Sequence, residues 1–474
     1  MSHSVTRQPK RIELPYQRDP CVWLDRIRPL RYAVLLDSNH RPHSGHQGRY
    51  DIVSAAPEWI VKTVSGNTSR TCLATGEVVK AAAGREPFAT LQHYFSDVET
   101  LDCPELPFSG GLVGFWGYEL NHLLEPHRIA ARSNALPDMV VGLYLWAVIT
   151  DHQTETSTLC LHPQISPAKQ RRLETLLQET DTKAVAADQR EEERFTITTP
   201  FTPQKTRQWY DDCFARIQAW IKAGDCYQVN LTRRFSARYR GDLWTAYRAL
   251  RRITPTPFAA FLDFPELTIL SHSPERLLNL QAGQVEARPI KGTIARGSNP
   301  AEDRQRAEQL KASCKDRAEN LMIVDMLRND LARSCLPGSI EVPTLFGLEQ
   351  YANVYHLVST VTGRLRADRT AFDLLRSAFP GASITGAPKI RAMQIIRELE
   401  PACRSVYCGA IGYISSNGRM DVNIPIRTLV ADNQNLHTWG GGAIVADSQC
   451  DSEYAESFIK VANLMEGLER QFGV

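Results

Sequence analysis

The chain has 474 residues, of which 43% are apolar and 23% charged, and its formal net charge is +2. This length exceeds the roughly 250–300 residues at which one ordinary core stops growing, so we expect two segments or one large intertwined unit. The balanced charge disfavours nucleic acid and acidic membranes as partners, and no apolar run approaches the roughly 20 residues that a membrane span requires.

Eleven cysteines are scattered from Cys21 to Cys450, and no two of them form a Cys-x-x-Cys pair. This pattern is typical of reduced, structural thiols, and it disfavours a disulfide framework or a zinc site. The first residues lack the apolar core of a secretory signal. We therefore expect a cytoplasmic protein.

The chain is predicted to consist of an N-terminal segment (1–165), a linker (166–205) and a second segment (206–474). Strands and turns dominate the first segment. Its strands are expected at 32–36, 108–115 and 143–149. A charged run at 190–194 marks the linker.

Regular helices are expected in the second segment. Asn299 and Pro300 form a capping signal, after which one long helix is predicted through about Leu331. Other helices are expected at 209–223, 388–399 and 453–468, and a strand at 421–430. Strands and helices alternate without a βαβ rhythm, which favours an α+β fold over a parallel-sheet fold.

Lys291 is the first candidate catalytic residue, because of the residues that surround it in the sequence. It lies in Pro289-Ile290-Lys291-Gly292-Thr293, a setting that suits an amine held rigidly toward a small polar ligand. Glu275, in Ser273-Pro274-Glu275, offers a carboxylic acid that could act with it. The pair suggests a lysine nucleophile with a proton-donating partner.

Glu319 and Arg427 each allow two interpretations. Glu319 is expected in mid-helix, where an ion pair with Lys315 four residues earlier is the simpler role, but carboxylates on two helices could also bind magnesium. Arg427 is expected in an apolar strand, either pointing to water or binding a carboxylate. Taken alone, Tyr407 fits a core aromatic residue. His356 and Thr385 fit structural roles.

The last predicted helix places Glu453, Glu456 and Lys460 on one face. Such a face is usually solvated and forms weak ion pairs. Three consecutive glycines, Gly440 to Gly442, precede it, and glycine allows backbone amides to approach an anion closely. Tyr454, Phe458, Val461 and Met465 are expected to form a separate apolar stripe that faces the core.

Five motifs, in this order, resemble the chorismate-utilising enzymes. They are Ser273-Pro274-Glu275, Pro289-Ile290-Lys291-Gly292-Thr293, Asp316-Arg317-Ala318-Glu319-Asn320, Gly381-Ala382-Ser383-Ile384-Thr385-Gly386-Ala387-Pro388-Lys389 and Gly442-Ala443-Ile444-Val445-Ala446-Asp447-Ser448. The resemblance implies a large intertwined antiparallel β-sandwich with helices packed on the outside. Within the family, lysine at position 291 is similar to the branch that aminates chorismate at C4, the aminodeoxychorismate synthases. The anthranilate synthases typically have alanine there.

The resemblance also implies roles for individual residues. Lys291 would attack C2 of chorismate, and Glu275 would donate a proton to the leaving hydroxyl. Magnesium would be held by Glu319 and Glu456, with Glu453 acting through water. The remaining substrate-binding positions would be Arg427, Tyr407, Gly441, Gly442, Lys460, Thr293, His356, Thr385 and Gln228. At position 228, the isochorismate- and salicylate-forming members have a water-activating lysine.

Further expectations follow from the same resemblance. Ser38, Tyr50, Pro257 and Phe258 resemble the family's pocket for L-tryptophan, which could be a bound ligand. Two departures concern the site: Pro425 replaces the usual alanine, and Gly441-Gly442-Ala443 replaces the commoner Gly-Ala-Gly order. Pro425 removes a strand amide beside Arg427.

A partner is also implied. No Gly-x-Cys-x-Gly nucleophile motif is present, so a separate glutamine amidotransferase subunit is expected to supply ammonia. The resemblance favours amination of chorismate on the path to 4-aminobenzoate and folate. The alternatives are an anthranilate synthase component I, which Lys291 disfavours, and a catalytically silent tryptophan-binding or scaffold subunit. The joint presence of Glu275, Lys291, Glu319 and Glu456 disfavours the silent subunit.

Overall fold

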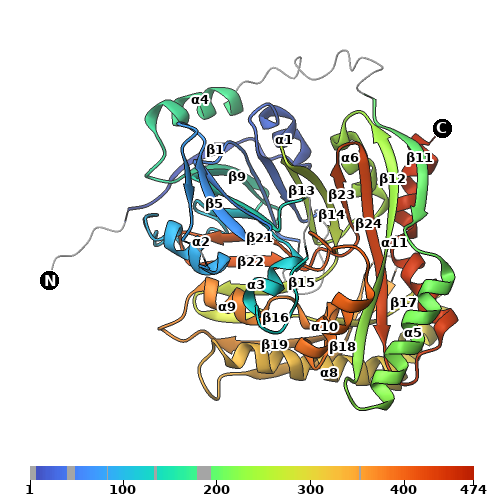
Figure 1. The fold of residues 1–474 in the computed structure, drawn as a ribbon. Coiled ribbons are helices and arrows are strands. Elements are labelled where there is room, and N and C mark those ends of the chain that lie inside the picture. The colour runs from blue at the N-terminus through green and yellow to red at the C-terminus, as the bar shows by residue number, and fades with distance from the viewer. Residues whose placement is uncertain are drawn as a thin grey trace.

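The fold was analysed in a computed structural model, which describes residues 7–39, 48–82, 84–132, 136–178, 194–351 and 354–473. Two antiparallel sheets dominate this part of the chain, and most of the helices lie around them (Figure 1). One hydrophobic cluster includes buried side chains of both sheets, such as Val34 from the first and Val113 from the second. The predicted α+β class and the intertwined antiparallel architecture are confirmed.

The first sheet combines strands from the beginning and the end of the chain. Its order is β1 (Lys10–Leu14), β10 (Thr156–Leu161), β9 (Trp146–Asp151), β3 (Tyr50–Ser54), β2 (Ala33–Asp37), β13 (Phe258–Phe264), β14 (Leu267–Ser273), β23 (Thr428–Asp432), β24 (Asn435–Ile444), β12 (Gln228–Arg240) and β11 (Thr196–Pro203), and β20 (Gly386–Ala387) also pairs with β12.

The second sheet also combines strands from the first and the later parts of the chain. Its order is β17 (Ile290–Ala295), β19 (Val354–Arg364), β16 (Gln284–Ala287), β15 (Arg276–Gln281), β22 (Met420–Asn423), β21 (Ala410–Ser415), β7 (Gly111–Trp116), β8 (Met139–Tyr144), β4 (Trp59–Val64), β5 (Asn67–Cys72) and β6 (Val78–Lys80), and β18 (Glu341–Gln350) pairs with β19.

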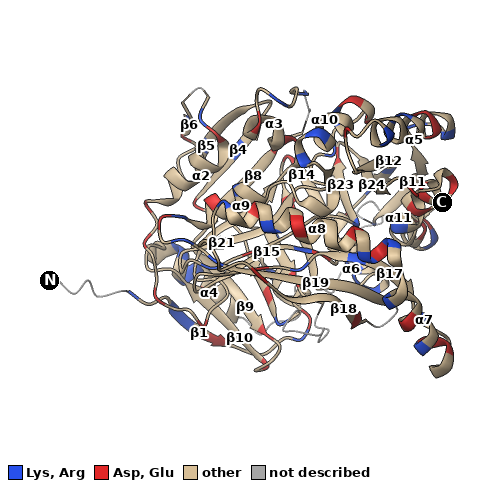
Figure 2. Cartoon of the chain, turned by 90° about the horizontal axis from the view of Figure 1, so that it is seen from below, with Lys and Arg blue, Asp and Glu red and all other residues tan. Residues whose placement is uncertain are grey.

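Charged side chains are more frequent in the helices than in the strands, which are mainly uncharged (Figure 2). The helices of the described residues are α1 (Cys21–Ile27), α2 (Pro87–Phe95), α3 (Asn121–Leu124), α4 (Pro167–Gln178), α5 (Arg207–Lys222), α6 (Leu243–Ile253), α7 (Pro300–Ala312), α8 (Cys314–Ala332), α9 (Ala371–Ala378), α10 (Lys389–Leu399) and α11 (Cys450–Phe472). Short 3-10 turns lie at Tyr118–Leu120 and Ala382–Ile384.

The predicted long helix after Asn299 is wrong in one respect, because it is two helices. Asn299 caps α7 as expected, and its side chain accepts hydrogen bonds from the amides of Ala301 and Glu302. The break occurs at Ser313, which has an extended backbone with ψ of 106° and whose side chain accepts from the amide of Asp316. Ser313 therefore ends α7 and caps α8.

Two predicted strands are also divided, because the chain passes from one sheet to the other within them. The run 143–149 is interrupted at Leu145, which separates β8 of the second sheet from β9 of the first. The run 421–430 is interrupted at 424–427, between β22 of the second sheet and β23 of the first. The strands on either side of each break are largely buried, so the burial pattern along the chain gives no sign of the crossing.

The apolar stripe predicted on α11 is correct for Val461 and Met465, which are buried. It is wrong for Phe458, whose side chain is 40% exposed although its ring contacts that of Phe235. Helix α11 is also longer than predicted, since it begins at Cys450 and ends at Phe472.

The predicted segment boundaries stay a prediction. The run 166–205 contains α4 and β11, and its charged part at 190–194 falls almost wholly outside the described residues. Strands from before and after this run pair directly, since β2 pairs with β13 and β7 with β21.

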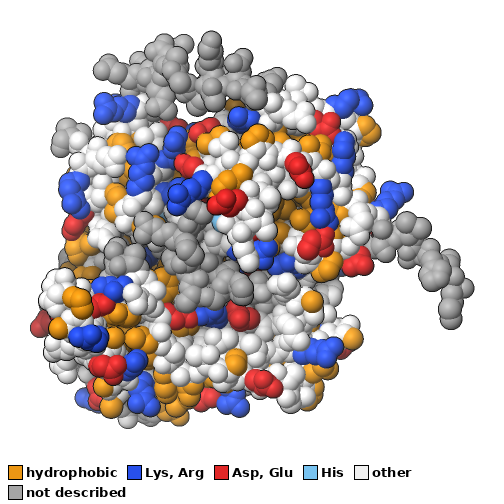
Figure 3. Space-filling model, turned by 180° about the vertical axis from the view of Figure 1, so that it is seen from behind, with side chains coloured by type: hydrophobic (Ala, Val, Ile, Leu, Met, Phe, Trp, Pro, Cys, Tyr) orange, Lys and Arg blue, Asp and Glu red, His pale blue; other side chains and the backbone are white. Residues whose placement is uncertain are grey.

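Acidic and basic side chains are interspersed on the molecular surface (Figure 3), as the small net charge suggests. No helix in the described ranges is both long enough and apolar enough to cross a membrane.

Candidate active site

The centre of the candidate site lies where the chain crosses between the sheets. Glu275 lies between β14 of the first sheet and β15 of the second, and Arg427 lies between β22 of the second and β23 of the first. Backbone hydrogen bonds join the two crossings, from the amide of Ile424 to the carbonyl of Glu275 (3.0 Å) and from the amide of His272 to the carbonyl of Arg427 (3.0 Å). The two predicted side chains are thus fixed relative to each other.

Lys291 lies on the edge strand β17, and its Nζ donates to the carbonyl oxygen of Ser383 at 3.3 Å. Burial lowers the pKa of Lys291, although the carboxylates of Glu319, Glu275 and Glu456 oppose this shift. Burial also raises the pKa of Glu275, against the opposing effects of Ser383 and Lys291. Lys291 is therefore shifted toward a neutral amine and Glu275 toward a neutral acid, the forms that a nucleophile and a proton donor need.

Acidic residues from two helices lie near Lys291. Burial raises the pKa of Glu319 on α8, while Lys291 and Lys315 oppose the shift. On α11, burial would raise the pKa of Glu456, but its 2.6 Å ion pair with Lys460 and the charges of Lys315 and Lys291 lower it overall. Glu456 is therefore held as a carboxylate.

Gly442 on β24 marks where the α11 carboxylates converge. A Cβ placed at Gly442 would lie 3.1 Å from Oε2 of Glu453 and 3.4 Å from Oε1 of Glu456. Within the described part of the chain, no three metal-binding side chains are close enough to form a complete metal site. Mg²⁺ often takes only one or two carboxylates and fills its other positions with water and substrate oxygens, so a magnesium site at Glu319, Glu456 and Glu453 stays a prediction.

Arg427, His356 and Thr293 form a second group. Thr293 Oγ1 lies 2.8 Å from Nδ1 of His356, the residue opposite it across the β17–β19 pair. Burial and the nearby Arg427 lower the pKa of His356 to about 4, so its imidazole is neutral near pH 7. Burial alone lowers the pKa of Arg427, and none of the ion pairs between described residues involves its guanidinium. Arg427 also has a left-handed backbone with φ of 51°, which is rare for residues other than glycine.

Tyr407, Thr385 and Gln228 are three further residues predicted to bind the substrate. Tyr407 is buried and stacks on Trp439, with ring centres 5.9 Å apart. The Thr385 hydroxyl donates to the carbonyl of Gly381 (3.0 Å) and so closes the 382–384 turn. Gln228 is fully buried on β12, and the Nε2 and Oε1 atoms of its side chain have no hydrogen-bond partner among the described residues. Their predicted contacts with substrate stay predictions.

Gly441 lies beside Lys460, whose Nζ donates to the Gly441 carbonyl at 2.9 Å. Lys460 thereby connects the glycine run of β24 with Glu456. This contact also places Lys460 among the charges that act on Lys291.

The predicted tryptophan-binding residues lie together in another pocket. Ser38, Tyr50, Pro257 and Phe258 all line it, and Arg276 and Tyr413 add lining from the second sheet. The Ser38 hydroxyl donates to Asp51 at 2.7 Å. The structure brings the four predicted residues together, and the identity of any ligand stays a prediction.

Sequence reasoning missed three contributors. Lys315 lies 4.0 Å from Glu319 but 3.1 Å from Glu453, so its closer ion pair is with the other helix. Ser448 holds the same Glu453 through a 2.8 Å hydrogen bond. Ser383 provides the carbonyl that accepts from Lys291. Ser383 and Ser448 both lie in the family motifs, but a contact between distant segments has no signature in local spacing.

Comparison with known proteins identifies the family. The family model of chorismate binding enzymes matches residues 35–466. The chain belongs to the chorismate binding enzyme family. Among the curated members, "Aminodeoxychorismate synthase component 1" of Salmonella typhimurium is 43% identical over 98% of this chain and 99% of its own length. The protein of the same name from Klebsiella aerogenes is 44% identical over 97% of this chain and 99% of its own length.

Solved structures of chorismate binding enzymes have the same fold. Anthranilate synthase component I from Streptococcus pneumoniae superposes with a TM-score of 0.77 at 32% identity, covering 88% of this chain and 92% of its own. The isochorismate synthase MenF from Escherichia coli superposes with a TM-score of 0.70 at 17% identity, covering 98% of this chain and 97% of its own. The likeness to MenF concerns the fold alone.

Proposed function

We propose that the chain is the chorismate-aminating component of an aminodeoxychorismate synthase, which converts chorismate and ammonia to 4-amino-4-deoxychorismate for 4-aminobenzoate and folate synthesis. The observation that carries this proposal is Lys291, a partly buried amine of lowered pKa that contacts Ser383 and lies near Glu275. The relatives named aminodeoxychorismate synthase component 1 match nearly the whole chain.

The reaction divides into two displacements. Neutral Lys291 Nζ forms a bond to C2 of chorismate, the two conjugated ring double bonds shift, and the C4–O bond breaks while Glu275 gives its proton to the leaving hydroxyl. Ammonia then bonds to C4, the two double bonds shift back, and the C2–N bond to Lys291 breaks. The Glu275 carboxylate takes a proton from the ammonium formed at C4, so that the net change replaces hydroxyl by amino at C4 and releases water.

The other residues of the site bind and orient the substrate. Arg427 forms no ion pair among the described residues, so its guanidinium is free to bind a carboxylate of chorismate. Glu319 and Glu456, with Glu453 through water, would hold Mg²⁺, which when bound supplies positive charge for the ring carboxylate. A glutamine amidotransferase subunit is the proposed source of ammonia, and L-tryptophan is the proposed ligand of the Ser38–Tyr50 pocket.

Anthranilate synthase component I is the second candidate, because a solved anthranilate synthase has the same fold at 32% identity. That reaction eliminates pyruvate and aromatises the ring, whereas amination through a lysine adduct retains the enolpyruvyl group. The product therefore distinguishes the two functions.

The deciding experiment is incubation of the purified protein with chorismate, Mg²⁺ and ammonium, followed by identification of the product by mass. We expect 4-amino-4-deoxychorismate, and anthranilate or no turnover would contradict the proposal. Lys291→Ala should reduce product formation by at least about 10³-fold. Lys311→Ala is a matched control, because Lys311 is exposed and, among the residues that the structure describes, pairs only with Glu308 on its own helix, so full activity is expected.

A further inference from the structure

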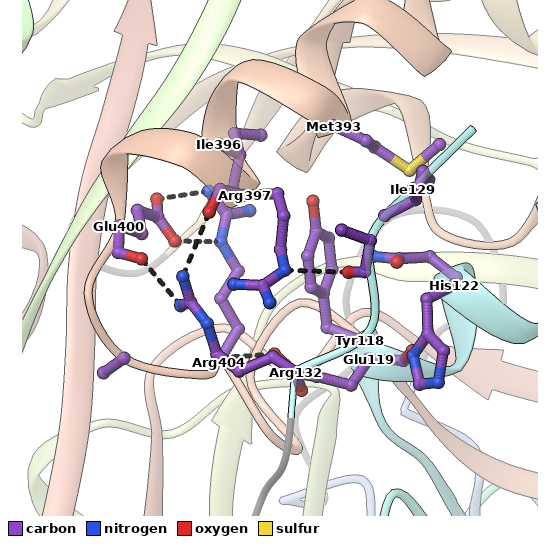
Figure 4. Close-up of a pocket in the computed structure, with 13 residues that line it drawn as sticks. Tyr118, Glu119, His122, Ile129, Arg132, Met393, Ile396, Arg397, Glu400 and Arg404 are labelled. Atoms are coloured by element: carbon purple, nitrogen blue, oxygen red, sulfur yellow. Dashed lines mark hydrogen bonds and ion pairs between the residues drawn. The ribbon is translucent and has the colours of Figure 1, made fainter. Parts of the chain in front are cut away.

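Arg404 is a buried cation close to, but outside, the candidate active site. It follows the C-terminal end of α10, and Figure 4 shows it beside Glu400, Tyr118 and Glu119. The residue is 1% exposed. Its Nε and Nη2 donate to the two carboxylate oxygens of Glu400, at 2.8 and 2.6 Å. A buried guanidinium is thereby paired with a carboxylate in a bidentate geometry.

The remaining donors of Arg404 bind two backbone carbonyls. Nη1 donates to the carbonyl of Ile384 at 2.8 Å, and Nη2 donates to that of Asn230 at 2.6 Å. The amide of Asn230 in turn donates to the carbonyl of Thr385 at 2.9 Å. Arg404 therefore links β12 at Asn230 to the turn at Ile384, next to the direct backbone hydrogen bond between Asn230 and Thr385.

The same turn holds the amine of Lys291. Ser383 lies at its centre and accepts the hydrogen bond from Lys291 Nζ. Lys291 and Arg404 therefore bind adjacent carbonyls of one three-residue turn. The two carbonyls belong to consecutive peptide units that meet at the Cα of Ile384, so Arg404 anchors the unit next to the one that binds Lys291.

We propose that Arg404 is a positioning residue for Lys291, acting through the Ile384 and Ser383 carbonyls to fix the direction of the lysine amine. The proposal rests on the proposed function, in which Lys291 is the nucleophile. Arg404 itself does not touch the substrate. A misplacement of about 1 Å can reduce a reaction rate by about 10²-fold, so this support matters for turnover.

The geometry requires arginine at this position. Its planar fork reaches Glu400 and both carbonyls at once, whereas a lysine ammonium is a single point donor on a flexible stem. Glu400 is held independently of Arg404, because its Oε1 also accepts from the amide and hydroxyl of Thr232, both at 2.9 Å. Arg404→Lys would thus keep the charge pair with Glu400 and lose the hydrogen bond to the Ile384 carbonyl of the turn.

The test is the variant Arg404→Lys in the full chain, with Arg397→Lys as the matched control. Arg397 appears in the same view, but its guanidinium donates to the carbonyls of Ala130 and Ala131, outside the turn (Figure 4). Chorismate-binding sites are counted by calorimetric titration, and turnover is expressed per site. Partial unfolding lowers the number of sites, whereas mispositioning lowers the turnover of each site.

We expect Arg404→Lys to reduce turnover per site at least tenfold while the KM for chorismate changes less than threefold. Arg397→Lys should stay within twofold of the wild type in both quantities. Turnover per site within twofold of the wild type in Arg404→Lys would overturn the proposal. If that variant does not fold, the double variant Glu400→Gln/Arg404→Gln removes both buried charges and is judged by the same criterion.

A second measurement separates this proposal from the proposed function. Cyanate carbamylates amines, and the rate at Lys291 is followed at fixed pH by peptide mass spectrometry. Arg404→Lys should change that rate at least threefold, and Arg397→Lys should not. If the wild type fails to make 4-amino-4-deoxychorismate, the proposed function fails, but the carbamylation comparison still decides whether Arg404 positions Lys291. Equal rates in the wild type and Arg404→Lys would overturn it.

Discussion

Lys291 and Glu275 are shifted in opposite directions by the same cause, the loss of water around them. Burial disfavours the ammonium of Lys291 and the carboxylate of Glu275, so each pKa moves toward the other. The nearby carboxylates limit the shift of Lys291, and Lys291 limits that of Glu275. The protonation states that the proposed chemistry needs thus arise from the burial of both residues, Glu275 at a crossing between the sheets and Lys291 on the edge strand β17.

These shifts predict a bell-shaped dependence of kcat on pH. Activity should fall at low pH because Lys291 becomes protonated, and at high pH because Glu275 loses the proton that it donates. Glu275→Gln should reduce kcat by about 10²- to 10⁴-fold, and the remaining activity should no longer fall at high pH. Measurement of kcat across pH for both proteins checks this, and an unchanged decline at high pH in Glu275→Gln would contradict the assignment.

Gly442 gives a prediction about the proposed magnesium site. Gly442→Ala places a methyl group 3.1 Å from Glu453 Oε2 and 3.4 Å from Glu456 Oε1, so the Glu453 carboxylate in particular must shift away from the methyl group. We expect the Mg²⁺ concentration for half-maximal activity to rise about tenfold, a loss of about 1.4 kcal/mol of metal binding. A titration of activity with Mg²⁺ tests this, and an unchanged midpoint would show that these carboxylates do not bind the metal.

The residue types at the site could be predicted, but several of their contacts could not. The family motifs located Lys291, Glu275, Glu319 and Glu456 as candidates. The sequence also suggested a local ion pair between Lys315 and Glu319, whereas the structure gives Lys315 a shorter one with Glu453. Glu453 is distant in the chain from Lys315, and only the tertiary fold brings the two together.

At the scale of elements, the caps were easier to predict than the breaks. Asn299 followed by Pro300 is a strong helix start because it satisfies free amides and needs no amide at the proline. Ser313 has the same capping ability but lies within a run of good helix formers, so its effect depends on the tertiary position of α8. The crossings at Leu145 and at 424–427 were hidden for a similar reason, since both flanking strands are buried.

The Ser313 cap makes a testable prediction about α8. Ser313→Ala removes the acceptor for the Asp316 amide and should cost about 1 kcal/mol of stability. It should also raise the Mg²⁺ requirement severalfold, because Glu319 lies in the second turn of that helix.

Thr206→Ala is the matched control, since Thr206 caps α5 in the same way by accepting from the amide of Trp209. Denaturant unfolding and Mg²⁺ titration of both variants provide the comparison. The control should lose similar stability with no change in Mg²⁺ requirement. Equal changes in both variants would show that the metal effect follows from stability alone.

At the scale of the molecule, the interleaved sheets predict that neither half folds alone. Residues 206–474 without the N-terminal segment would leave β13 without β2 and β21 without β7. We expect this fragment to show no cooperative thermal transition, and the full chain to unfold in one main transition. Calorimetry of both tests this, and a cooperative transition in the fragment would support an independent second domain.

The two crossings between the sheets have a consequence for tolerance to mutation. Glu275 and Arg427 each lie on a short connection with one end in either sheet. The spacing between the sheets, set by core side chains such as Leu270 and Val422, therefore determines how far the acid lies from the arginine. Enlarging or shrinking a core residue that never meets the substrate should change turnover as well as stability, so in this fold the precision of the chemistry depends on the packing of the core.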